Sequence, residues 1–412
     1  MDFTYKYTEQ QEKFRKEVRT WLDEMMATIP EEMKEPVDPD DFTEEQYSFW
    51  QEQHKELAKK GWLYPTFPKE YGGGGLTADH DAILQEELER AGFYTRFPSS
   101  TNVLGALAVW ATEEQKQKFL VPLLKGEQAS WQKFTEPKSG ADLASYQSRA
   151  VRDGDDWIIN GSNVFVSRHG AKPDYLWGPA LTDPEAPRHR NLGFFMIPCP
   201  SPGLEIKPLR LVQGKDQHFV FLDNVRVPGD HLIGGDHQGW QVANTVLEEE
   251  HGGAGRAYPS NPVVDNLVKF MAAHEQQDQS PGGDPVVQQK ALDAYLEARI
   301  DRVFKLRTNW MYVNRKETTW EGPTQFYFQR TYGFRNVARV RDVMGMYALL
   351  GTHDPLAPYG GAQEVDQRTS FIHQHGAGSL NITKVVVARR IGISRTTERA
   401  APTRMTAGGH SS

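Results

Sequence analysis

The chain of 412 residues contains one cysteine, Cys199, and no long apolar run. A single cysteine excludes an internal disulfide and a cysteine-based metal cluster, and it favours a cytoplasmic protein. No segment approaches the roughly 20 apolar residues of a membrane-spanning helix, and the mean hydropathy is -0.63. The first residues lack the charged-then-apolar layout of a secretory signal. We therefore expect a cytoplasmic protein that does not enter a membrane.

Clustered basic charge, phosphate loops and metal-binding patterns are also missing. The net charge of -8 and a pI near 5.9 argue against nucleic-acid binding, which needs a clustered basic surface. The four glycines at 72–75 are not followed by Lys-Ser or Lys-Thr, so they predict a flexible turn. His373 and His375 have no Asp, Glu or Cys at ligand spacing, and no metal site is expected.

The hydrophobic pattern changes twice along the chain. Apolar residues at three- and four-residue steps predict helices before and after a central region. That region consists of short β-favouring runs separated by glycine and proline, which indicates a small barrel or sandwich. We predict an α+β protein with an N-terminal helical domain (1–126), a β-domain (127–238) and a C-terminal helical domain (239–395). The polar tail (396–412) is expected to be disordered.

One segment of the β-rich region combines a proline-fixed turn, a hairpin and an aromatic residue beside a hydroxyl. Thr135 and Ser139 offer hydroxyls around the turn, and the Asp-Gly pair in 153–155 is a hairpin signal. Further on, Phe165 lies two residues before Ser167. Two interpretations fit: a flat polar heterocycle stacked on the ring and hydrogen-bonded at its edge, or an ordinary hairpin with a buried phenylalanine.

Seven motifs in one order make the chain resemble the acyl-CoA dehydrogenase family over nearly its whole length. They read FPKEYGGGGLT with EELERAG, ATEEQKQKFLVPLLKGE, FTEPKSGADL, IINGSNVFVS, FLDNVRVPGDHLIGGDHQGW, LEEEHGG and GAGSLNITKVVVARRIG. The resemblance implies that family's fold, in which a C-terminal four-helix bundle follows the β-domain. It also implies bound FAD, an acyl-CoA substrate and an electron-transfer flavoprotein as partner.

The resemblance also implies which residues contact the flavin. The family's contacts fall on five positions of this chain: Gln132, Phe134, Thr135, Phe165 and Ser167. Thr135 is the expected hydroxyl partner of the isoalloxazine edge. A serine that the family commonly has near the substrate is replaced here by Ala141, which removes one ligand hydrogen bond from this part of the cofactor site.

The reaction implied is α,β-dehydrogenation of an acyl thioester, in which a carboxylate removes the α proton. Many members carry that glutamate just before the closing helix, where this chain has Ala377, which cannot accept a proton. A minority, including isovaleryl-CoA dehydrogenase, carry it on the first helix of the C-terminal bundle in an L-x-x-E-R pattern. Residues 247–251 match that pattern except that His251 replaces the arginine, which makes Glu250 the expected base. The alternative is a solvated charge in a run of three glutamates.

Two departures from the family concern the part of the flavin site that a neighbouring subunit supplies. No arginine occurs between Arg256 and Arg299, and the usual glycine-rich run keeps one glycine, Gly345. A homodimer or homotetramer is expected, and a hetero-oligomer is the alternative. Two other functions remain open: a non-catalytic partner subunit, and a flavin oxidase or monooxygenase in which oxygen reoxidises the flavin.

Overall fold

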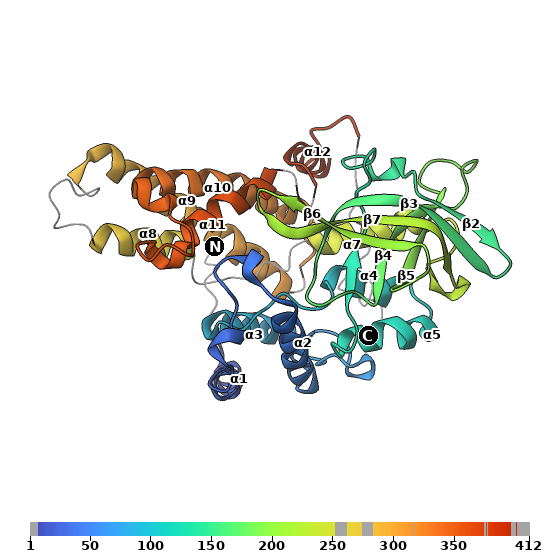
Figure 1. Ribbon diagram of the computed structural model, residues 1–412, viewed down its shortest axis with the longest axis horizontal. Helices are drawn as coiled ribbons and strands as arrows, with labels where there is room; N and C mark the ends of the chain where they lie inside the picture. The colour runs from blue at the N-terminus through green and yellow to red at the C-terminus, as the bar shows by residue number, and fades with distance from the viewer. Residues whose placement is uncertain are drawn as a thin grey trace.

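The structure, a computed structural model, describes residues 7–251, 262–273, 283–314, 316–374, 376, 378–396 and 401. Helices lie on both sides of one β-region along the chain (Figure 1). The predicted α+β class and the order of helical, β and helical regions are confirmed. Most of the tail predicted to be disordered lies outside the described residues. Among the described residues, no helix is both long and apolar enough to cross a bilayer.

The N-terminal helices begin at well-formed caps. Thr8, Thr43 and Thr112 each accept a hydrogen bond from the backbone N–H three residues on, where a glutamine returns the bond. These capping boxes fix where each helix starts. The helices are α1 (Glu9–Met26), α2 (Glu44–Lys59), α3 (Ala78–Ala91), α4 (Thr101–Trp110), α5 (Glu113–Gln115) and α6 (Val121–Leu124).

The β-region is a single sheet with the strand order β6-β7-β3-β2-β4-β5-β8, and β1 pairs in parallel with β4. The predicted hairpin is the β2–β3 turn, where Asp153 pairs with Asp156 and Gly154 has a φ of 64°. The strands are β1 (Ser130–Gln132), β2 (Arg149–Asp153), β3 (Asp156–Ser167), β4 (Tyr175–Leu181), β5 (Leu192–Pro198), β6 (Leu204–Leu211), β7 (Gly214–Val227) and β8 (Leu232–Ile233).

The C-terminal region is helical, and its two long helices α9 and α10 pack along each other. The side chain of Asp284 caps α9 by accepting from the Val286 N–H at 2.8 Å, with Pro285 at the first helical position. The helices are α7 (Gly239–His251), α8 (Pro262–Ala273), α9 (Pro285–Val313), α10 (Glu321–Met344), α11 (Ala362–Thr369) and α12 (Leu380–Arg390).

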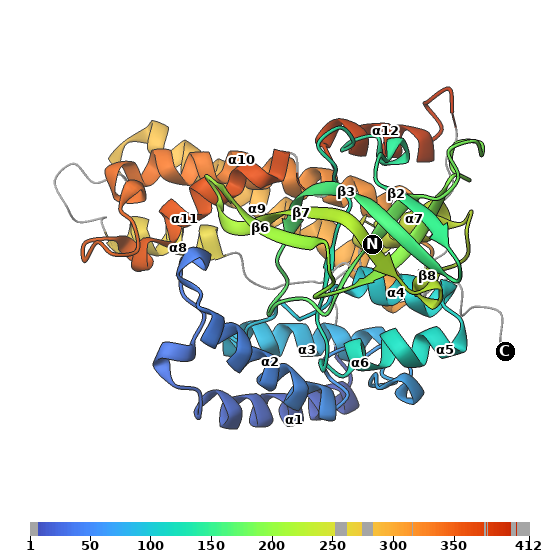
Figure 2. The same cartoon turned by 45° about the vertical axis from the view of Figure 1, so that its right-hand side comes forward.

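Helix α7 is the element on which the three regions meet (Figure 2). Its apolar residues Val242, Ala243 and Val246 belong to the largest hydrophobic cluster, which also contains side chains from the N-terminal helices and from the strands β4 and β5. In both ribbon views α7 lies close to α4 and the strands (Figure 1, Figure 2). Polar side chains near the end of α7 are therefore held between the β-region and the C-terminal helices.

Candidate active site

The strand β3 carries an exposed aromatic ring near its C-terminal end. A bulge interrupts the pairing of β3 with β7 between Asn163 and Val166, and Phe165 within it has a φ of 57°. This left-handed backbone leaves the side chain 54% exposed. The interpretation as an ordinary hairpin with a buried phenylalanine is therefore wrong. The ring at this position is therefore accessible to a ligand.

Thr135 lies next to this bulge because a hydrogen bond joins the two segments. The backbone N–H of Val164 donates to the Thr135 carbonyl at 2.9 Å. Ser167 accepts a hydrogen bond from the Gln217 amide of β7 at 2.9 Å. The turn that bears Thr135 and the strand that bears Phe165 and Ser167 are thus neighbours, as a shared ligand requires.

The other expected flavin contacts differ in where their side chains lie. Phe134 is 5% exposed and meets Trp177 edge-on, with ring centroids 5.6 Å apart. Its ring belongs to the hydrophobic core, so this position can offer a ligand only its backbone. Gln132 is half-buried on β1, and Ala141 is exposed in the loop after the turn.

A buried lysine lies beneath the same turn, and sequence analysis missed it. Lys133 is fully buried and donates to the Pro179 carbonyl at 3.0 Å. Burial lowers the pKa of the Lys133 ammonium to about 8, and the charge of Glu136 opposes that shift. Glu136 accepts a hydrogen bond from the Ser148 N–H at 2.8 Å. These contacts fix the turn at Thr135 from the inside, and no sequence pattern indicates a lysine in a core.

Helix α7 carries three consecutive carboxylates, of which two are committed to neighbours. Glu248 accepts two hydrogen bonds from Arg390 of α12, at 2.9 and 2.6 Å, and both side chains are nearly buried. Glu249 packs on α4, since a Cβ built on Gly105 lies 2.8 Å from its Oε1. Glu250 is half-buried. The helical rotation between the three residues thus gives each carboxylate a different environment.

Glu250 lies within electrostatic range of Arg330 on α10. Burial lowers the pKa of the Arg330 guanidinium, and the charge of Glu250 raises it. Ala377 and His375 lie outside the described residues. Among the described residues, no group of three or more His, Cys, Asp or Glu side chains is arranged to hold a metal ion.

A hollow of about 470 Å³ opens beside the N-terminal end of α7. His237, in its wall, contacts the Arg190 carbonyl through Nδ1 at 2.9 Å. Arg188, next to this wall in the sequence, forms an ion pair with Asp142. An arginine near a helix N-terminus favours an anionic group. The hollow is lined by Asp183, Ala186, Pro187, Arg190, His237, Gln238 and Gln241.

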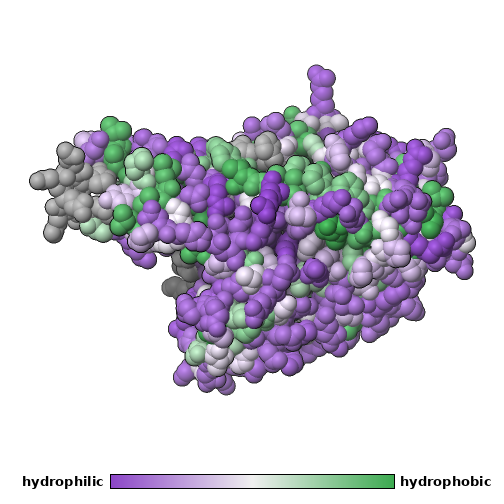
Figure 3. All heavy atoms as spheres, in the orientation of Figure 1, coloured by the Kyte–Doolittle hydropathy of each residue, from purple (hydrophilic) through white to green (hydrophobic). Residues whose placement is uncertain are grey.

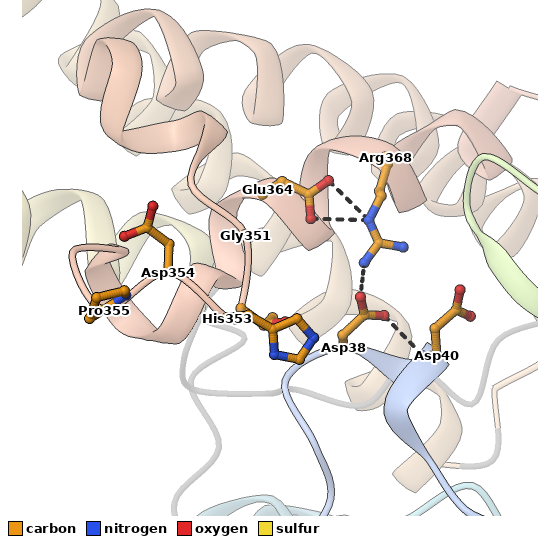
Figure 4. A pocket seen from close by; sticks show the side chains of 9 residues that line it. Asp38, Asp40, Gly351, His353, Asp354, Pro355, Glu364 and Arg368 are labelled. Atoms are coloured by element: carbon orange, nitrogen blue, oxygen red, sulfur yellow. Dashed lines mark hydrogen bonds and ion pairs between the residues drawn. The ribbon is translucent and has the colours of Figure 1, made fainter.

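A second hollow, of about 610 Å³, lies between the segment before α2 and the C-terminal helices (Figure 4). Its arginine, Arg368, donates to Glu364 at 3.0 Å and also pairs with Asp38. Asp40 and Asp354 add further negative charge to the wall. Two carboxylates already neutralise the guanidinium, so this hollow does not favour a phosphate. The arginine instead ties α11 to the N-terminal region.

Two family models match the chain, each over one of its regions. The N-terminal domain of acyl-CoA dehydrogenase matches residues 8–127, and the middle domain matches residues 132–225. Together they span just over half of the sequence. The matched ranges include the turn at Thr135 and the bulge at Phe165.

Whole-chain relatives agree with these models. Acyl-CoA dehydrogenase FadE26 of Mycobacterium tuberculosis is 26% identical over 394 residues, covering 92% of this chain and 96% of that protein. The structure of the Tcur3481-Tcur3483 steroid ACAD has a TM-score of 0.80 at 26% identity, covering 97% of this chain and all of that one. The ChsE4-ChsE5 complex from Mycobacterium tuberculosis, at 24% identity and a TM-score of 0.79, shares the fold over 95% of this chain.

The order of a helical, a β and a helical region is that of an oxidoreductase class that acts on acyl-CoA. The chain belongs to the acyl-CoA dehydrogenase family.

Proposed function

We propose that the protein is an FAD-dependent acyl-CoA dehydrogenase that converts an acyl-CoA thioester to the trans-2-enoyl-CoA and passes the electrons to an electron-transfer flavoprotein. The observation that carries the proposal is the separation of the three carboxylates on α7. Glu248 is bound to Arg390 and Glu249 packs on Gly105, so Glu250 is the base that removes the α proton. A positioned general base contributes about 10²- to 10⁴-fold to the rate.

FAD suits the C-terminal end of β3 and the turn at Thr135 beside it. The half-exposed ring of Phe165 suits stacking on an isoalloxazine, and the hydroxyls of Thr135 and Ser167 suit hydrogen bonds at its polar edge. Gln132 and the backbone of Phe134 complete the part of the proposed flavin site that the β-region supplies. Ala141 lies where the family commonly has a serine. When bound, the flavin supplies the electron acceptor for the hydrogen that leaves the β carbon.

The hollow at the start of α7 suits the phosphate end of coenzyme A. The chain is acidic overall, so an anionic ligand needs a local basic group. Arg190 and His237 provide one in the wall of the hollow. The acyl end then points along α7, toward Glu250. Because the Tcur3481-Tcur3483 structure is that of a steroid ACAD, a steroid-type acyl-CoA is the first candidate substrate.

An exposed apolar stripe on α9 supports an oligomer. Its residues recur at three- and four-residue steps on one face of the helix and are each close to half exposed, which monomeric proteins avoid in continuous patches. Figure 3 shows apolar patches over the C-terminal helices at the left. We propose that this stripe packs against a second copy of the chain in a homodimer or homotetramer. The stripe consists of Leu292, Tyr295, Leu296, Ile300 and Val303.

A hetero-oligomer is the second candidate assembly, because the similar structures carry the names of two chains. The altered flavin half-site around Gly345 fits either a hetero-oligomer or a non-catalytic partner subunit. The single cysteine, Cys199, supports a cytoplasmic location.

Anaerobic flavin bleaching by acyl-CoA tests the proposal. Glu250→Gln is expected to keep the yellow colour and to bleach about 10²- to 10⁴-fold more slowly than the natural chain. Glu249→Gln is the matched control, because it makes the same change on the same helix, and it is expected to bleach within a few-fold of the natural rate.

Each alternative function gives a different result in the same assay. Unimpaired bleaching by Glu250→Gln removes Glu250 from the role of base. A colourless natural chain that binds no FAD identifies a partner subunit, and rapid reoxidation in air with peroxide identifies an oxidase. A panel of straight, branched and steroid-type thioesters then identifies the substrate class.

A further inference from the structure

Tyr146, in the segment between β1 and β2, is a buried tyrosine that the proposed function does not use. It is 3% exposed. Its hydroxyl donates to the Lys133 carbonyl at 3.1 Å and also to the Phe134 carbonyl. These two acceptor residues directly precede Thr135 in the chain. The phenol therefore holds the backbone that leads into the turn at Thr135.

The residue after Thr135 is fixed to the same stretch of chain. Glu136 is 4% exposed, and its carboxylate accepts hydrogen bonds from the backbone N–H groups of Gln147 and Ser148 at 2.6 and 2.8 Å. It also accepts from the Ser148 hydroxyl. Gln147 and Ser148 directly follow Tyr146. Thr135 thus lies between residues that are tied, before and after it, to the stretch that leads into β2.

Lys133 attaches this arrangement to the sheet. Its backbone N–H donates to the Trp177 carbonyl at 2.9 Å, and its ammonium donates to the Pro179 carbonyl at 3.0 Å. The ammonium also lies 5.8 Å from the centroid of the Tyr146 ring. A Cβ built on Gly178 lies 2.4 Å from the Lys133 carbonyl oxygen, so only glycine lets β4 approach this closely. The lysine and the tyrosine therefore support the turn together from the inner side of the β-region.

The side chain of Thr135 stays accessible although its neighbours do not. Thr135 is half-buried, whereas Phe134 and Glu136 on either side of it are at most 5% exposed. A Cβ built on Gly140 lies 3.8 Å from the Thr135 methyl carbon, so the far side of the turn packs on that methyl group. A hydroxyl carried by backbone that is already fixed loses little freedom when a ligand binds.

We propose that Tyr146 is a positioning residue for the flavin, which acts with Lys133 to hold the Thr135 hydroxyl where the polar edge of the isoalloxazine binds. This inference rests on the proposed flavin site. Without the phenol hydroxyl, two backbone carbonyls lose a buried donor. A turn that is correctly ordered only part of the time binds its ligand more weakly, in proportion to the ordered fraction.

The first experiment measures the dissociation constant of FAD by titrating the chain from which flavin has been removed. Tyr146→Phe deletes one hydroxyl and is expected to raise this constant about tenfold, because a buried hydrogen bond that orders the turn is lost. Tyr64→Phe is the matched control. Tyr64 is 2% exposed and donates to the Ser99 carbonyl at 2.7 Å. The control is expected to lower the melting temperature to a similar extent and to keep the natural affinity for FAD.

A double variant tests whether Tyr146 acts through Thr135. Thr135→Val removes the hydroxyl and keeps the shape of the side chain, so it is expected to weaken FAD binding by itself. Adding Tyr146→Phe to it is expected to change the affinity little further, because the group that the tyrosine positions is already absent. Two effects that multiply in the double variant show that Tyr146 acts independently of that hydroxyl, and they overturn the inference.

An unchanged FAD affinity in Tyr146→Phe also overturns the inference, as does an equal loss of affinity in Tyr64→Phe. Should Tyr146→Phe not fold, Lys133→Met takes its place, because it removes the hydrogen bond to Pro179 and keeps an unbranched stem. An unchanged affinity in Lys133→Met is then sufficient to overturn the inference. Failure of the proposed function is distinguishable, because in that case the natural chain itself binds no FAD.

Discussion

The N-terminal and C-terminal halves of the molecule bury their apolar residues to different extents. One cluster unites the N-terminal helices, one face of the β-region and α7, whereas the described C-terminal helices share two much smaller clusters. Most of the large apolar side chains that stay exposed also lie after residue 262, on α9 and in the segments around α11 and α12. The first half therefore completes its own core, whereas the described part of the second half leaves much of its apolar surface exposed.

The largest effect on stability is expected from two Leu→Ala substitutions, one in each half of the molecule. Leu107 of α4 and Leu267 of α8 are both almost fully buried, one in the large cluster and one in a small one. Leu→Ala costs about 2–5 kcal/mol, depending on how well the site collapses around the cavity. We expect about 5 kcal/mol for Leu107→Ala and about 2 kcal/mol for Leu267→Ala in denaturant unfolding. Equal losses of stability in the two variants contradict the difference in core packing between the two halves.

The second prediction concerns the ion pair that joins α12 to α7. Arg390→Met leaves the Glu248 carboxylate buried without its partner, which costs about 3–5 kcal/mol. Adding Glu248→Met to it replaces the charged pair by apolar groups and is expected to restore most of the stability. The melting temperatures of the single and double variants check this. A double variant as unstable as Arg390→Met shows that packing, rather than the unpaired charge, is responsible.

An acid titration tests how the first half holds its helices together. Burial raises the pKa of Glu87 on α3, but hydrogen bonds from Arg19, Arg90 and Arg15 outweigh it and lower the pKa to about 2. A depressed carboxyl pKa contributes stability that is fully present above about pH 4.5 and is lost as the pH falls toward 2. The contribution is on the order of 3 kcal/mol. In Glu87→Gln, unfolding followed from pH 6 to pH 2.5 should show a smaller loss of stability with falling pH.

A substitution on the α9 stripe is expected to have the smallest effect on folding and a large effect on assembly. Leu296→Glu places a charge on a half-exposed position, so the stability of the isolated chain changes by no more than about 0.5 kcal/mol. The mass in solution is expected to fall to that of a smaller assembly. Leu356→Glu, at a side chain 75% exposed outside the stripe, is the control that keeps the natural mass.

The outcome of the stripe experiment also separates the two assemblies. A natural chain that is monomeric alone, and that gains mass only with a second dehydrogenase chain, identifies the hetero-oligomer. An unchanged mass in Leu296→Glu removes α9 from the interface.

Local signals predicted the order of regions and the β2–β3 hairpin. The Asp-Gly pair and the switch of hydrophobic period involve residues that are close together in the chain, so both can be recognised without the tertiary structure. The orientation of Phe134 was not predictable, because it follows β1 directly after Lys133, and both adjacent side chains are buried although one is apolar and the other charged. The local sequence around an aromatic residue of the core does not differ from that around an aromatic residue that contacts a cofactor.

The site on α7 was predictable only in part. Helical rotation limits a shared slot to one of three adjacent glutamates, but it does not say which one. The surroundings of Glu248 and Glu249 depend on Arg390 and Gly105, which lie far from α7 in the sequence and come close only through tertiary packing. The same holds for Lys133, whose burial beside Glu136 is a property of the closed sheet.

Under the proposed flavin site, the backbone at Phe165 links cofactor supply to the amount of protein. A non-glycine residue in the left-handed region costs about 1–2 kcal/mol, and the apolar ring there also remains in contact with water. The flavin stacking proposed above would remove that contact, and binding would then stabilise the native state by mass action. Cells short of riboflavin should then contain less of this chain as well as less active chain, because molecules without cofactor unfold and are degraded more often.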